Sequence, residues 1–80
     1  MTPRVSYVKY KPHYRLIVTF SNNEVKEFDL RQYLDYPVYE PLRDEAFCKK
    51  VKAKDGVVLW DDVIDIDPDT IYLESVPVLN

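Results

Sequence analysis

Residues 15–20 alternate strictly between two kinds of position, and this alternation constrains the fold more than any other feature of the sequence. Every second side chain is a large apolar one, at Leu16, Val18 and Phe20. An extended strand directs successive side chains to opposite faces, so these three side chains share one face. We therefore predict a strand over residues 15–20 that buries this face.

The segments on either side of this strand predict two partners for it. Residues 4–10 are rich in β-forming side chains, and Pro12 follows them in a turn because its ring fixes φ at a value that suits turns. Residues 21–24 contain two asparagines, which tolerate the positive φ of a hairpin turn, and Val25–Phe28 returns as a third strand. We predict a three-stranded antiparallel meander over residues 5–28.

Two helical segments are expected after the meander. Asp29 can cap a short turn that Pro37 must end, because the residue before a proline is disfavoured in a helix. Residues 41–50 carry apolar side chains at near-helical spacing and end in two lysines, which suit the negative end of the helix dipole. We expect this second helix to pack on one face of the sheet.

The last third of the chain predicts one further strand and one short helix. Gly56, the one glycine of the chain, marks a turn before Val57–Trp60, whose continuous apolar run is typical of a buried strand. We predict that this strand extends the meander and that Trp60 is mostly buried. Asp67 followed by Pro68 is typical of a helix start, with an acceptor at the N-cap and proline at the first position.

The fold class that these segments predict is α+β. It consists of an antiparallel three-stranded meander plus one further strand, with one or two short helices packed on one face. The 80 residues are enough for one small domain, so we expect residues 1–80 to form a single unit. A domain of this size buries only about 60–65% of the surface that its unfolded chain exposes. Seven Tyr, three Phe and one Trp are the expected compensation, because each aromatic ring buries a large area.

Charge and composition exclude several classes of protein. A net charge of −3 argues against a protein whose main ligand is a nucleic-acid backbone, since such binding needs an excess of cations. No apolar run approaches the roughly 20 residues that span a bilayer, and no secretory start is present. One cysteine cannot form an internal disulfide. We expect a cytoplasmic domain without a membrane partner.

Several short blocks together resemble a known family. They are Phe20–Leu30, Pro41-Leu42 with Phe47, Val58–Trp60, Asp65-Ile66 and Pro68–Tyr72. In this order they are similar to the small prokaryotic family catalogued as domain of unknown function 2442, over roughly residues 5–73. The resemblance implies a small α+β domain without assigned catalytic residues. It also implies relatives that are fused to helix-turn-helix domains or encoded beside another small protein, in loci resembling toxin–antitoxin pairs.

An acidic segment near the C-terminus is the first candidate for chemistry. Its acids are Asp61, Asp62, Asp65, Asp67, Asp69 and Glu74. A calcium loop would need glycine where Thr70 stands and a bidentate glutamate where Val76 stands. A chain with one glycine also lacks a phosphate-binding loop. We therefore expect a solvated loop and a helix cap, with no metal or cofactor.

Cys48 and His13 are the only thiol and imidazole of the chain, and catalysis would need them adjacent in space. The expected helix makes Cys48 a small buried side chain, whereas His13 lies at a hairpin tip. We therefore expect no enzyme and no catalytic residue. A small metal-dependent hydrolase is the third-ranked hypothesis.

Basic residues near the N-terminus favour a second function. Arg4, Lys9, Lys11 and Arg15 lie in a segment without acids, residues 1–23, that also contains several tyrosines. Cations beside aromatic rings on a sheet can stack bases and follow a phosphate backbone. The alternative hypothesis is therefore a regulator that contacts nucleic acid through this hairpin.

Tyr33, Tyr36 and Tyr39 surround Pro37 in an irregular stretch and favour the first-ranked function. Tyrosine is enriched at the energetic centres of protein interfaces, although the same rings can also cover a small core. We predict a non-enzymatic protein-binding module that uses these three residues. The family resemblance implies that its partner is another small protein, with this chain as the antitoxin-like or accessory member of a two-gene locus. A homo-oligomer stays open as a further form of association.

Overall fold

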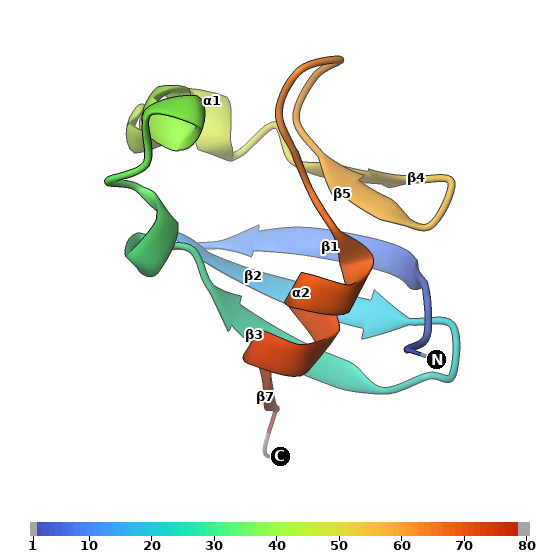
Figure 1. Cartoon of the computed structure of the whole chain (residues 1–80). Helices are drawn as coiled ribbons and strands as arrows, with labels where there is room; N and C mark the ends of the chain where they lie inside the picture. The colour runs from blue at the N-terminus through green and yellow to red at the C-terminus, as the bar shows by residue number, and fades with distance from the viewer. Residues whose placement is uncertain (1, 79–80) are drawn as a thin grey trace.

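The computed structural model describes residues 2–78 and contains two antiparallel sheets connected by short helices (Figure 1). The first sheet has the order β1-β2-β3-β7, with β1 Val5–Lys11, β2 Arg15–Phe20, β3 Val25–Asp29 and β7 Val76–Pro77. The second has the order β4-β5-β6, with β4 Lys52–Lys54, β5 Val57–Leu59 and β6 Asp65–Ile66. The helices are the 3-10 helices η1 Arg31–Tyr33 and η2 Pro37–Arg43, and the α-helices α1 Glu45–Cys48 and α2 Pro68–Glu74. The α+β class is confirmed; residues 1, 79 and 80 of the predicted domain lie outside the described range.

The meander over residues 5–28 is confirmed, with β2 paired antiparallel to β1 and β3. Leu16, Val18 and Phe20 have no exposed surface, so the alternation of β2 does bury one face. Asn23 adopts a φ of 71° in the turn between β2 and β3, which is the conformation that asparagine tolerates best among residues with a Cβ.

The predicted strand at Val57–Trp60 forms over its first three residues, but it does not extend the meander. It pairs with β4 and β6 in the second sheet. The reason is the two-residue turn at Asp55 and Gly56, where φ values of 54° and 84° are those of a type I′ hairpin. Closing such a short loop costs less entropy than pairing with a distant strand. The sheets meet where the Val5 amide donates to the Gly56 carbonyl at 3.1 Å.

The single helix expected at residues 41–50 is replaced by two short ones. Asp44 lies between η2 and α1 in an extended conformation, with φ −77° and ψ 109°. Its carboxylate accepts a hydrogen bond from the Ala46 amide at 3.1 Å, so it caps α1 instead of continuing the preceding helix. Leu42 and Cys48 nevertheless both reach the core, as the apolar spacing requires.

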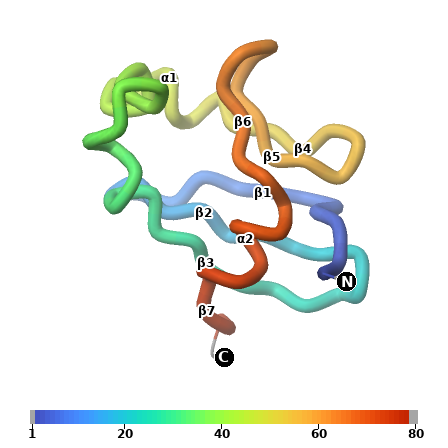
Figure 2. The backbone as a smooth tube through the Cα atoms, viewed as in Figure 1, coloured from blue at the N-terminus to red at the C-terminus, as the bar shows by residue number. Residues whose placement is uncertain are grey.

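The core lies between the inner face of the first sheet, the second sheet and the helices. Trp60 is 4% exposed, as predicted, and its indole Nε1 donates to the Cys48 carbonyl at 2.9 Å. Helix α2 crosses the inner face of the first sheet (Figure 2), where the rings of Tyr72 and Phe20 form a T-shaped pair with 5.0 Å between centroids. Asp67 caps α2 as predicted, since its carboxylate accepts from the Asp69 amide at 3.5 Å. No helix within residues 2–78 has the length and apolarity needed to cross a membrane.

The opposite face of the first sheet has no cover within residues 2–78. Alternation and register place on it ten side chains, which we call the outer sheet face: Tyr7, Lys9, Lys11, Arg15, Ile17, Thr19, Val25, Glu27, Asp29 and Val76. Tyr7 is 61% and Val76 60% exposed, whereas the inner-face side chains of β2 are fully buried. Antiparallel sheets commonly have one face toward solvent, but this one carries large apolar groups there.

Candidate functional site

The predicted tyrosines lie together on η1, η2 and the link between them. The local sequence explains the path of the chain: the Asp29 carboxylate accepts from the Arg31 amide at 2.9 Å and starts η1. Tyr36 is extended, with φ −80° and ψ 133°, because Pro37 follows it and begins η2. We call Tyr33, Tyr36, Val38 and Tyr39 the tyrosine surface.

The tyrosine surface is anchored to the core through Tyr33. This ring stacks on the buried Phe28 at 5.6 Å between centroids, and Tyr36 and Tyr39 each lie 5.9 Å from Tyr33. The Tyr33 hydroxyl donates to Glu74 on α2. Burial, and then this hydrogen bond, raise the pKa of Tyr33 well above its usual value of 10, so the hydroxyl stays a donor at neutral pH.

Tyr39 and Arg43 hold the rest of this surface in place. The Tyr39 hydroxyl donates to the Asp65 carbonyl at 3.3 Å, and burial also raises the pKa of Tyr39. The Arg43 guanidinium donates to the Leu34 carbonyl at 2.8 Å and pairs with Asp35 at 3.0 Å. These contacts fix η2 against β6 and against the end of η1.

Tyr36 and Val38 are the members of this surface that face solvent, with 53% and 55% of their area exposed. Val38 was not predicted from the sequence as a site residue. The sequence feature that could have indicated Val38 is its position between Tyr36 and Tyr39. That position does not show whether the Val38 side chain is exposed to solvent. The surface therefore combines two exposed apolar side chains with two that are half-buried and held by hydrogen bonds.

The four predicted basic residues do not form one site. Lys9, Lys11 and Arg15 lie on the outer sheet face, but Lys11 and Arg15 both pair with Glu27, at 3.0 and 3.4 Å. The hydrogen bond from Lys11 lowers the pKa of Glu27, so this carboxylate stays ionised at neutral pH. Arg4 precedes the sheet, and its guanidinium donates to the Asp55 carbonyl at 3.1 Å. One of the four, Lys9, thus presents its charge on that face away from these contacts.

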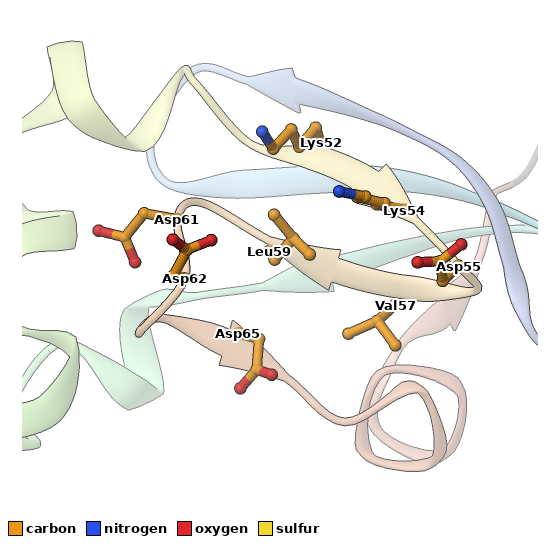
Figure 3. Close-up of a pocket in the computed structure, with 8 residues that line it drawn as sticks. All are labelled: Lys52, Lys54, Asp55, Val57, Leu59, Asp61, Asp62 and Asp65. Atoms are coloured by element: carbon orange, nitrogen blue, oxygen red, sulfur yellow. The ribbon is translucent and has the colours of Figure 1, made fainter.

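Three acids of the acidic segment, Asp61, Asp62 and Asp65, line a shallow hollow of about 330 Å³ on the second sheet (Figure 3). Val57 and Leu59 form its floor, Lys52 and Lys54 lie along β4, and four aspartates surround it. No group of three or more His, Cys, Asp or Glu side chains within residues 2–78 is arranged to hold a metal ion. The mixed charges of the hollow balance one another in part and do not define a ligand.

One of these aspartates, Asp61, has a clear structural role. One carboxylate oxygen of Asp61 accepts from the Val63 amide at 2.9 Å and from the Ile64 amide at 2.7 Å. The turn that Asp61 forms brings the Ile64 carbonyl to the Trp60 amide at 2.9 Å. Asp61 therefore closes the loop between β5 and β6.

We expect Asp61→Ala to lower the free energy of unfolding by about 1–2 kcal/mol, because two backbone amides lose a charged acceptor. Asp67→Ala should cost less, about 0.5–1 kcal/mol, because its capping bond is long. Asp62→Ala is the matched control and should leave the urea midpoint unchanged. Urea unfolding at constant slope measures all three. Unchanged midpoints in both Asp61 and Asp67 variants would contradict these roles and favour a ligand-binding role for the acids.

Cys48 and His13 have unlike environments. Cys48 is fully buried in α1, and burial raises the pKa of its thiol to about 11. A buried, protonated thiol is a poor nucleophile. His13 lies exposed in the turn between β1 and β2, with a φ of 71°. Cys48 thus serves the core, as the sequence predicts.

The comparison with known families agrees with the resemblance found in the sequence. Residues 5–77 match the family described as "Protein of unknown function (DUF2442)", which is nearly the whole described chain. The chain belongs to this family. No curated protein and no solved structure matches it. The DUF2442 family carries no catalytic assignment.

Proposed function

We propose that this DUF2442 domain is a non-enzymatic module that binds another small protein through the tyrosine surface. The observation that carries the proposal is the exposure of Tyr36 and Val38, 53% and 55%, beside aromatic rings that are held in place. Anchored tyrosines supply contact area at a low cost in conformational entropy. The buried thiol of Cys48 supports the non-enzymatic part of the proposal.

The position of Tyr33 explains how the surface is prepared for a partner. Its ring lies between the core ring of Phe28 and the exposed ring of Tyr36, and its hydroxyl is held by Glu74. The partner therefore does not have to order this part of the surface on binding. Preorganisation of this kind raises affinity because less freedom is lost in the complex.

The partner that we expect is a small protein encoded beside this chain, with the DUF2442 domain as its antitoxin-like or accessory member. Such a partner should place apolar side chains over Tyr36 and Val38. The rim of the tyrosine surface carries one positive and one negative charge, those of the Arg43–Asp35 pair. These charges favour a partner whose contacting edge carries charges of both signs over one whose edge carries a single sign. A small domain also gains stability when a partner covers its exposed apolar area.

Titration of the neighbouring protein into the Tyr36→Ser/Val38→Ser variant tests this proposal. We expect the affinity to fall at least tenfold, which corresponds to about 1.4 kcal/mol or more, as at other interface centres. The control is Val63→Ser/Leu73→Ser, since these two side chains are 77% and 72% exposed on other parts of the molecule. An affinity that is equal in both variants, or a domain that does not bind the neighbouring protein, would contradict the proposal.

The alternative function is a regulator that contacts nucleic acid. It is favoured by Tyr7, 61% exposed on the same face as Lys9. It is disfavoured by Glu27, which already binds Lys11 and Arg15. Single-stranded RNA that binds with a steep salt dependence, and less tightly to the Lys9→Ala variant, would favour this alternative over protein binding.

A further inference from the structure

The outer sheet face is a continuous surface that the protein binding proposed above does not use. Eight large hydrophobic side chains are exposed among the described residues, and four of them gather here: Tyr7, Val25, Val76 and Val78. Val78 continues the face beyond β7, because its amide donates to the Val25 carbonyl at 3.2 Å. Ile17 lies at the centre of the sheet and does not pack into the core cluster. An apolar centre of this kind is typical of a surface that is covered in an assembly.

The charges of this face are divided between its two halves. Lys9, Lys11 and Arg15 lie on β1 and β2, whereas Glu27 and Asp29 lie on β3. The formal sum is +1, so neither a polyanion nor a strongly acidic protein is favoured as its occupant. The six acids of residues 61–74 belong to the second sheet, its loops and α2, away from this face. Two copies can therefore approach through it without bringing their acidic segments together.

The register makes the face complementary to itself. A twofold axis parallel to the strands, between two stacked sheets, places β1 and β2 of one copy over β7 and β3 of the other. Arg15 and Asp29 are directly paired neighbours in one sheet, so they stand at the same height along the strands. Arg15 of each copy then lies over Asp29 of the other, although each also has an ion-pair partner in its own chain. Along the next row Lys9 lies over Val76 and Ile17 over Glu27. At the far end of the strands Tyr7 lies over Val78, because both align with Val25 in the register.

We infer that the outer sheet face binds a second copy of this chain and forms a weak symmetric dimer. β1, β2, β3 and β7 have 7, 6, 5 and 2 residues, which at about 3.4 Å rise and about 4.8 Å spacing give a flat area on the order of 330 Å² per copy. With projecting side chains the two copies together bury roughly 800 Å², which is the low end of the range of weak, transient complexes. Face-to-face sheets at a separation of about 10 Å are a common packing. This interface is separate from the tyrosine surface, so one dimer offers two partner sites.

Sedimentation velocity from about 10 µM to about 1 mM protein tests the dimer, because weak complexes dissociate in this range. We expect a sedimentation coefficient that rises with concentration, and amide NMR shifts on dilution that are confined to the outer sheet face. The Tyr7→Thr/Ile17→Thr variant keeps β-forming side chains and should weaken the dimer at least tenfold while its circular dichroism stays native. Val63→Thr, on the loop between β5 and β6, is the matched control and should not change the dimer.

Three results would overturn the dimer. A chain that stays monomeric at about 1 mM shows that no such complex forms in the weak range. A dimer equally stable in the outer-face and control variants uses another surface. Perturbation of the outer-face amides by single-stranded RNA or by the neighbouring protein, with no change on dilution, assigns the face to that partner instead. The partner titrations of Tyr36→Ser/Val38→Ser read out the tyrosine surface independently.

Discussion

Trp60→Ala is expected to lower the free energy of unfolding by about 3–5 kcal/mol, the usual cost of removing a buried aromatic side chain. Trp60 is 4% exposed and belongs to the core that the two sheets share. Its indole also satisfies the Cys48 carbonyl at the end of α1, at 2.9 Å. A domain of this size has a total stability of about 4–12 kcal/mol, so this loss removes a large share of it.

Trp60→Phe separates packing from hydrogen bonding at this position. The variant keeps an aromatic ring but removes the indole donor to the Cys48 carbonyl, which still accepts from the Val51 amide at 3.3 Å. We therefore expect the lost hydrogen bond to cost about 0.5–1.5 kcal/mol. Trp60 is the only tryptophan of the chain, so urea unfolding of all three proteins should be followed by far-ultraviolet circular dichroism. A loss below about 1 kcal/mol in Trp60→Ala would contradict the place of this side chain in the core.

Gly56→Ala is expected to cost about 1–3 kcal/mol, because it strains the backbone where the two sheets meet. Gly56 has a φ of 84°, a conformation that residues with a Cβ rarely adopt. A Cβ at this position would also lie 2.5 Å from Nε of Arg4, so the Arg4 side chain would have to move. That movement would break its hydrogen bond to the Asp55 carbonyl.

A double-mutant cycle with Arg4→Ala isolates the steric part of this cost. Arg4→Ala alone should lose little, because the side chain is exposed and gives up one hydrogen bond. In the Arg4→Ala background, Gly56→Ala should cost less than in the natural chain, by the energy of the clash. Urea midpoints measure each corner of the cycle. Equal costs in both backgrounds would show that backbone strain alone accounts for the effect.

The tyrosine surface was predictable from the sequence as a cluster, but its division of roles was not. Three tyrosines around a proline indicated an interface, and the structure does place Tyr33 against Tyr36 and Tyr39. Tyr33 is the anchored ring because it contacts Phe28 and Glu74. Glu74 lies 41 residues after Tyr33 in the chain. The exposure of Val38 depends on the same folding of η2 against β6.

The basic hairpin shows a limit of reading charge along a sequence. Residues 1–23 contain no acid, yet Lys11 and Arg15 are paired with Glu27 from the next strand. Arg4 was grouped with them because it is near in sequence. It lies instead at the Gly56 turn, where the ends of β1 and β4 meet. Charge patterns on strands become meaningful only after the register between strands is known.

The sequence by itself determined the features that depend on near neighbours. These are the strand at residues 15–20, the asparagine turn after it, the cap at Asp67 and the family, because alternation, φ preference and capping act within a few residues. Tertiary structure decided which tyrosine is anchored, through Glu74, and which acid pairs with Lys11 and Arg15. It also left the outer sheet face open. These outcomes depend on how the burial and loop-closure free energies differ between alternative long-range contacts. No local sequence pattern contains that difference in free energy.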